Sequence, residues 1–280
     1  MDCSRWILPL PGGVQYTRRM KKIFAIMILL ALLAGGLQAE DIRVVVPYLG
    51  AATNVYDNPD LPNALEDTKL MEGLFFQWVN PDLFQANVFV YHSADINYSQ
   101  LWGGHLIGDF YVWSNPLGKA AVGAGFEVIS LDMDAGAGEI VPGSTFQLPL
   151  KVYVPYARAG HYFYLGSRDR VLLSIFPWAG AEYDITRGTI TMVPGPPPLS
   201  IDDETFYGIA GLSLSATLFH FIELQAKYKA NFNADNLLHT VDGMANVFFT
   251  RHWGLSYRFK YMQTTDGSTS YHIGGIAYVF

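Results

Sequence analysis

Ile222-Glu-Leu-Gln-Ala-Lys-Tyr-Lys-Ala-Asn-Phe232 is the stretch of sequence that decides the fold. Every second side chain from Ile222 onward is apolar or aromatic, and the side chains between them are charged or polar. Successive side chains of a strand point to opposite faces, so a strand separates these two sets completely. A helix would spread the charges around its circumference. The stretch therefore predicts a strand with one apolar and one polar face.

The same period of two returns in the segments 146–154, 241–249 and 253–261. In each of them we assign the apolar set to the outer face of a sheet and the polar set to its inner face. For 146–154 this assignment places Leu150 outside and Lys151 inside. No helical pattern of comparable length competes, so the sequence predicts an all-β chain.

Short and long connections separate the predicted strands in strict alternation. The five short turns lie near 80–83, 114–118, 166–169, 219–221 and 250–252. The six longer polar segments lie near 57–68, 94–100, 132–144, 185–203, 233–239 and 264–269. Interleaved in this way, they predict about twelve strands in an antiparallel, up-and-down arrangement, with both ends of the chain on the short-turn side.

Eight or ten strands remain the alternatives, because the segments 42–56 and 69–79 alternate poorly. Four prolines also fall inside predicted strands, where a missing N–H removes a ladder hydrogen bond. They mark the strand boundaries that are most open to revision: Pro47, Pro149, Pro155 and Pro177.

A secretory signal is predicted over 20–39. Basic residues precede an apolar run over 23–33, and small residues then lead to cleavage after Ala39. The apolar run is shorter than the roughly 20 residues that a transmembrane helix needs. Residues 1–39 are therefore interpreted as an upstream extension plus a cleavable signal peptide, and 40–280 as one barrel domain.

The last strand ends on an aromatic residue, with Ile276, Tyr278 and Phe280 at alternate positions. Together with the signal, this ending resembles the closing strand of bacterial outer-membrane β-barrel proteins of the porin-like kind. Smaller OmpW-type barrels are similar in alternation and terminal Phe, although they have eight strands. The resemblance implies the cell outer membrane as the location, membrane lipid as a partner, and recognition of the C-terminal strand by the barrel-assembly machinery.

Tryptophans beside the short turns support a membrane interface. Trp78, Trp113 and Trp253 lie at the level expected for an aromatic girdle. An ordinary soluble β-sandwich with core aromatics is the alternative. It explains neither the signal with a terminal Phe nor the difference between short and long connections.

The charge balance argues against nucleic-acid binding. From Glu40 onward the chain has 13 Lys and Arg against 24 Asp and Glu, whereas phosphate contacts need clustered cations. The single cysteine, Cys3, lies upstream of the signal, so no disulfide is expected. We expect no cofactor and no metal, because the acidic clusters at 132–134 and 202–204 lack the spacing of a calcium loop.

The candidate functional residues are charged side chains that are predicted to point into the barrel. The twelve-strand layout places acidic residues on strands four and five and basic residues on strands nine and eleven, facing each other across the lumen. Such walls would create a transverse field that orients hydrated solutes. The candidate pore-lining residues are Asp109, Glu127, Lys227, Lys229, Arg258, Lys260 and Glu223.

Two functions follow from this layout. The first is a channel or porin for small hydrated or apolar solutes. The second is a structural or adhesin-type surface barrel, whose charges pair and close the lumen and whose loops meet extracellular ligands. The proline-rich loop 192–199 is a candidate for such a contact.

We do not expect an enzyme. The outer-membrane phospholipase also has twelve strands, but its serine–histidine motif is not recognisable here. His105 and Asp109 fall four apart on one strand face and are both predicted to point inward.

Overall fold

The computed structural model describes residues 41–56, 65–93, 99–135, 145–167, 170–219, 221–265 and 267–280. The predicted signal and the upstream extension lie outside these ranges. The strands are β1 (Ile42–Tyr56), β2 (Leu65–Asn80), β3 (Phe84–Ser93), β4 (Ser99–Asn115), β5 (Gly118–Ala135), β6 (Thr145–Gly166), β7 (Val171–Val193), β8 (Leu199–Leu218), β9 (Ile222–Phe232), β10 (Leu237–Phe248), β11 (Trp253–Thr264) and β12 (Gly267–Val279). In the described ranges, no helix has the length and apolarity to cross a membrane.

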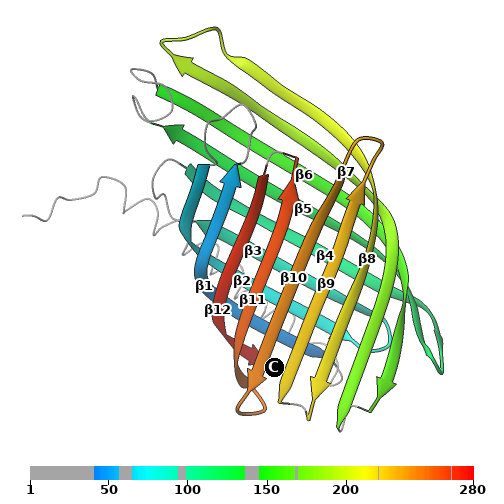
Figure 1. The fold of residues 1–280 in the computed structure, drawn as a ribbon. Helices are drawn as coiled ribbons and strands as arrows, with labels where there is room; N and C mark the ends of the chain where they lie inside the picture. Colours follow the sequence, from blue (N-terminus) through cyan, green and yellow to red (C-terminus); the bar gives the residue numbers. More distant parts are fainter. Residues whose placement is uncertain are drawn as a thin grey trace, which may run out of the picture. The chain divides into compact units, whose positions relative to one another are not determined.

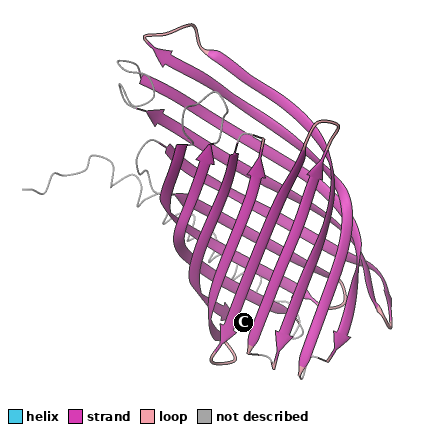
Figure 2. Cartoon of the chain, in the orientation of Figure 1, coloured by secondary structure: helices cyan, strands magenta, loops and turns pink. Residues whose placement is uncertain are grey.

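The strands close into one antiparallel barrel. Each strand pairs with its neighbours in sequence, and β1 pairs with β12 to complete the ring. This closing ladder runs from Val44 opposite Val279 to Tyr56 opposite Gly267. Figure 1 shows β1 and β12 side by side, and Figure 2 shows that strands make up nearly all of the barrel. Twelve strands are confirmed, and the alternatives of eight and ten are wrong.

The five predicted short turns all connect consecutive strands. Asparagine side chains shape two of them. The Oδ1 atom of Asn80 accepts hydrogen bonds from the backbone N–H groups of Asp82 and Leu83, both at 3.0 Å. Asn115 accepts in the same way from Leu117 and Gly118 at 2.8 and 2.9 Å. These local bonds explain why the chain reverses at these residues.

One predicted loop is wrong. Most of 185–203 is strand, and only 194–198 lies between β7 and β8. The ladder continues from Ile185 opposite Glu204 to Ile190 opposite Leu199. The segment is rich in Thr and Ile, whose β-branched side chains favour extended structure despite the polar composition. The resulting hairpin of β7 and β8 forms the long yellow-green projection in Figure 1.

The four prolines lie inside strands rather than at their boundaries. Pro47 falls in a gap of the β1–β12 ladder, and Pro149, Pro155 and Pro177 fall in or opposite three gaps of the β6–β7 ladder. Each proline keeps its pairing with the strand on its other side. The missing N–H of each proline therefore interrupts the hydrogen-bond ladder, or seam, on one side of the strand without ending the strand. In a twelve-membered ring these two seams lie opposite each other.

The predicted faces of β9, β10 and β11 are confirmed. Side chains at Leu224, Val241 and Leu255 are 42%, 40% and 59% exposed on the outside, while the charged and amide side chains between them turn inward and are more buried. An apolar exterior with a polar interior is the arrangement that a lipid environment stabilises.

β1 and β2 alternate poorly because they are apolar on their inner face too. Val46, Tyr48, Met71 and Phe75 are buried inside the barrel in one hydrophobic cluster. The lumen is therefore not uniformly polar. Along these strands it contains a packed apolar layer.

The outer half of β6 has the opposite orientation to the predicted one. Gln147 and Lys151 are exposed on the outside, whereas Leu150 and Val152 turn inward. The reason is that this part of β6 lies more than a dozen residues from its short turn, beyond the roughly 9 to 11 residues that span a bilayer. Its outer face meets water, and the pattern of a lipid-facing strand no longer applies.

Aromatic side chains gather beside the short turns. Trp78 packs edge-on against Phe84 with ring centroids 4.9 Å apart, and Trp253 lies 4.7 Å from Tyr278. Trp113 is 59% exposed. In the terminal strand, Ile276 and Phe280 also face outward, at 51% and 49% exposure. The backbone N–H of Phe280 donates to the carbonyl of Arg43 at 3.1 Å, which ties the C-terminus to β1.

A charge placed on the outer apolar face tests this orientation. Val241→Arg should lower the free energy of unfolding by about 2–4 kcal/mol, because the guanidinium would enter hydrocarbon near mid-strand. Urea titration of the protein folded into lipid vesicles measures the change. Val193→Arg is the matched control, since Val193 is 60% exposed at the projecting hairpin tip, and it should have little effect. Equal losses would show that the outer face does not contact lipid.

Candidate functional site

The seven candidate residues lie on the inner face of the barrel. Five of them contact strands that are not their neighbours in the sheet, and such contacts are possible only through the lumen. Glu223 and Lys227 lie on the same inward face of β9 as Lys229. The candidates come from β4, β5, β9 and β11, as predicted. What the structure changes is how their charges are arranged.

Glu127 and Lys260 bridge the lumen. The Nζ atom of Lys260 donates to Oε1 of Glu127 at 3.2 Å, and both side chains are at most 15% exposed. β5 and β11 are six strands apart in either direction around the ring, so this ion pair joins opposite walls. It limits free passage at this height.

Arg258 reaches across the lumen from β11. It donates to Asp242 on the neighbouring strand, with Nη2 and Oδ2 2.6 Å apart. Its guanidinium also lies 4.8 Å from the ring centroid of Phe89 on β3. Tyr48, whose ring lies 6.1 Å from that of Phe89, is hydrogen bonded through its hydroxyl group to the hydroxyl of Ser256 at 2.6 Å. Charge and aromatic packing together fill this part of the lumen.

Asp109 is paired with Arg158, a residue that the sequence analysis did not single out. The Nε and Nη2 atoms of Arg158 donate to the two carboxylate oxygens at 2.9 and 2.7 Å. Tyr162 donates to the same carboxylate at 2.9 Å. The guanidinium lies 5.3 Å from Phe176 and 5.1 Å from Trp178. Only 2% of the Asp109 side chain is exposed, so this is a buried, hydrogen-bonded pair.

The sequence contains a pattern that predicts an inward orientation for Arg158. Tyr156, Arg158 and Tyr162 stand at even positions of β6, and Ala157 and Ala159 stand between them. Small residues outside and large polar residues inside fit a lumen-facing set. The reversed assignment of 146–154 concealed this pattern.

The remaining candidates lie on β9. Lys229 donates to Glu182 of β7 at 2.7 Å. Glu223 accepts from Gln225 at 2.9 Å and from Asn246 at 3.0 Å. Lys227 stands opposite Asp242 in the ladder. Among the described residues it has no ion pair within 4.0 Å, so it is the candidate cation whose charge is least neutralised.

The picture of separate acidic and basic walls is therefore wrong. Arg158 on β6 pairs with Asp109 of the predicted acidic wall, and Glu182 on β7 and Asp242 on β10 pair with cations of the basic one. Among the ion pairs of the described residues, that of Glu127 and Lys260 joins the two walls. Unpaired charges are costly where water is scarce, which favours local pairing over two charged walls.

His105 and Asp109 do not act on each other. The ring of His105 packs 5.7 Å from Phe89, and Asp109 is bound by Arg158 and Tyr162. In the acidic segment 202–204, Asp202 and Glu204 are ion paired with Arg187 on the outside of the β7–β8 hairpin. Within the described part of the chain, no group of three or more His, Cys, Asp or Glu residues is placed to hold a metal ion.

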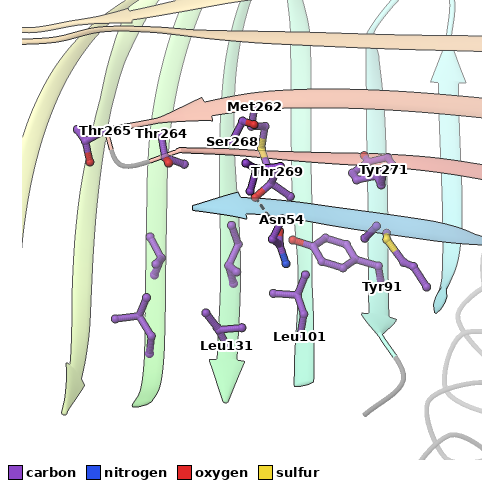
Figure 3. A pocket seen from close by; sticks show the side chains of 16 residues that line it. Asn54, Tyr91, Leu101, Leu131, Met262, Thr264, Thr265, Ser268, Thr269 and Tyr271 are labelled. Atoms are coloured by element: carbon purple, nitrogen blue, oxygen red, sulfur yellow. Dashed lines mark hydrogen bonds between the residues drawn. The ribbon is translucent and has the colours of Figure 1, made fainter. Parts of the chain in front are cut away.

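An apolar cup occupies the outer part of the lumen, near the ends of the strands that adjoin the long connections. Its volume is about 260 Å³. Figure 3 shows its lining residues converging on a shared space, with Thr269 hydrogen bonded to Asn54 at 2.9 Å. Four strands supply most of its apolar side chains: Met71, Leu101, Ile129, Leu131, Leu150 and Val152. Sequence analysis missed the cup, although the apolar inner faces of β1 and β2 were visible as poor alternation.

A closed antiparallel barrel with an apolar exterior and charged interior defines the fold of outer-membrane β-barrel proteins. No family model matches the chain, and no curated protein matches its sequence.

Solved structures agree on the fold. The chain is similar to the translocator domain of the autotransporter NalP from Neisseria meningitidis, with a TM-score of 0.56, 13% identity and coverage of 95% of this chain and 98% of that one. A Pseudomonas aeruginosa FadL homologue matches with a TM-score of 0.45, 12% identity and coverage of 86% and 90%. The KdgM porin matches with a TM-score of 0.38, 10% identity and coverage of 84% and 99%. The likeness to the NalP translocator domain, whose TM-score exceeds 0.5, shows the fold alone.

The buried pair of Asp109 and Arg158 should contribute strongly to stability. Asp109→Asn leaves the guanidinium buried without its counter-charge and should cost about 3–5 kcal/mol of unfolding free energy. Urea titration in lipid vesicles measures the loss. Asp202→Asn removes a carboxylate from an exposed ion pair with Arg187 and should cost no more than about 1 kcal/mol. Similar losses in both variants would contradict the structural role assigned to Asp109.

Proposed function

We propose that the chain is an integral outer-membrane barrel whose lumen forms a gated channel for small solutes. The proposal includes export through the predicted signal and recognition of the strand ending at Phe280 by the barrel-assembly machinery. Its membrane placement rests on the outward apolar residues, the aromatic rings beside the short turns, and the fold that the chain shares with outer-membrane barrels.

The observation that carries the channel proposal is a set of inward polar atoms without a hydrogen-bond partner among the described residues. Asn87, Asn231 and Asn246 each bury an amide oxygen in this way, and Arg258 buries Nη1. Buried polar groups without a protein partner are normally satisfied by water. They come from β9, β10 and β11 and, on the opposite side of the ring, from β3. They support a hydrated path around the aromatic and charged layer, rather than a dry plug.

The ion pair of Glu127 and Lys260 is the proposed gate. It is the contact that joins opposite walls, so breaking it widens the path without disturbing a neighbouring ladder. Lys227, with no ion pair in the described structure, gives the open lumen a positive site beside Asp242. Such a lumen would retain hydrated solutes by fixed charge and hydrogen bonding.

Conductance tests the gate. Wild-type protein in a planar bilayer should give discrete steps, and Glu127→Gln should raise the ratio of open to closed time by about tenfold, because a charge-assisted hydrogen bond is lost. Glu204→Gln is the matched control: it removes a carboxylate from the exterior of the hairpin and should leave gating unchanged. If neither the wild type nor Glu127→Gln conducts, the channel proposal fails and the closed surface barrel is favoured.

A surface-binding role is the second candidate, and the β7–β8 hairpin favours it. β7 and β8 are among the longest strands, with 23 and 20 residues, and the tip beyond them is exposed. Arg187 on its outer side binds Asp202 and Glu204. A hairpin held in this way would present residues 194–198 at a distance from the membrane.

Accessibility on whole cells tests this orientation. An antibody against residues 192–199 should label intact cells, because the hairpin lies on the long-connection side. An antibody against the short turn 166–170 should label only permeabilised cells. Labelling of the short turn on intact cells would reverse the proposed orientation.

Deletion of 192–199 tests the surface-binding role. It should abolish any adhesion that the hairpin causes, and unchanged adhesion would exclude this loop.

A further inference from the structure

We propose that the apolar cup in the outer lumen is a binding site for a small uncharged molecule that is largely apolar and carries one polar group. The inference deepens the proposed function, on which it rests, by naming a class of solute. It starts from the contrast between the cup and its surroundings. The interior of a membrane barrel is usually polar, yet this part of the lumen is lined mainly by aliphatic side chains.

The lining excludes charged ligands. Of the described residues that line the cup, none carries a formal charge. The ion pair of Glu127 and Lys260 belongs to the lumen but does not line the cup. A charged solute would lose hydration here without gaining a counter-charge, whereas an apolar one would gain by leaving water.

The volume sets the size of the ligand. A dry apolar cavity of about 150 Å³ accepts benzene, so the 260 Å³ of the cup corresponds to about ten non-hydrogen atoms by proportion. This size fits a substituted aromatic ring or a short branched chain. A disaccharide or a long acyl chain would not fit within it.

Tyr271 provides the polar contact. Its side chain lines the cup and is only 4% exposed, and its hydroxyl has no hydrogen-bond partner among the described residues. Burying a hydroxyl without a partner is costly. The hydroxyl is closed off from solvent in this structure, so a ligand with one hydroxyl or carbonyl group would satisfy it once the Tyr271 side chain turns toward the cup.

The floor of the cup adjoins the proposed gate, because Tyr271 stands opposite Lys260 in the β11–β12 ladder. Tyr91 and Tyr271 both line the cup, and their rings lie 5.4 and 6.0 Å from Phe89. Phe89 in turn lies beneath the guanidinium of Arg258. A ligand in the cup therefore rests on Tyr91 and Tyr271, which pack against Phe89.

Fluorine NMR tests binding directly. The probe is 4-fluorobenzyl alcohol, which is uncharged, has one hydroxyl and has the expected size. The protein is studied in lipid nanodiscs, and empty nanodiscs of the same lipid provide the blank for partitioning. Saturable binding is expected with the protein and not with the blank. The ion 4-fluorobenzoate has a similar size and should not compete.

Two variants localise the site. Val152→Trp fills the cup and should abolish saturable binding, whereas Val247→Trp, at a position 49% exposed on the outer face, should leave binding unchanged. Tyr271→Phe should weaken binding of 4-fluorobenzyl alcohol by about two- to tenfold, the loss of one neutral hydrogen bond. It should not weaken binding of 4-fluorotoluene. Heat-modifiable migration on gels verifies that each variant is folded.

The outcomes separate this inference from the channel proposal. Two results would contradict the proposed ligand site while leaving the channel proposal intact. One is conductance without saturable binding, and the other is binding that Val152→Trp does not reduce. Equally tight binding of 4-fluorobenzoate overturns the assignment of an uncharged ligand. Saturable, cup-dependent binding without conductance supports the site but refutes the channel, leaving a ligand-binding surface barrel.

Discussion

The hydrogen-bonding requirement of the backbone in lipid is the constraint on which this structure depends. Hydrocarbon offers no partner to an N–H or C=O group, so a sheet that spans a bilayer must close on itself. The pairing of β1 with β12 meets this requirement, and the remaining ladders follow from the order of the strands. The four prolines interrupt two opposite seams, but pairing on their other sides carries each strand through the interruption.

A closed ring leaves its inward charges in a confined space, and this confinement determines how they pair. Arg158 binds Asp109 across two strands, and Lys260 binds Glu127 across the whole lumen. Both contacts satisfy charges that would be costly to leave alone away from bulk water. The ion pair of Glu127 and Lys260, which satisfies two buried charges, also narrows the lumen.

The environment of a strand changes along its length, and this change explains why the outer part of the lumen is lined by apolar side chains. Where β6 faces lipid, its outer positions carry Ala157 and Ala159; farther out they carry Lys151 and Gln147, because the surroundings are aqueous there. The inner positions change in the opposite sense, to Leu150 and Val152. An apolar site can therefore lie at the wet end of the barrel, above a layer of paired charges.

The sequence by itself determined the five short turns and the faces of β9, β10 and β11 and indicated about twelve strands, because alternation and turn-forming residues are local properties. Closure of the ring decided between twelve strands and the alternatives of eight and ten. Only the tertiary structure decided which charges meet, since Asp109 and Arg158 or Glu127 and Lys260 become neighbours through ring closure. It also decided the orientation of Leu150 and the existence of the cup. A pattern of period two separates the two faces of a strand, but the surroundings decide which face is turned toward lipid, water or the lumen.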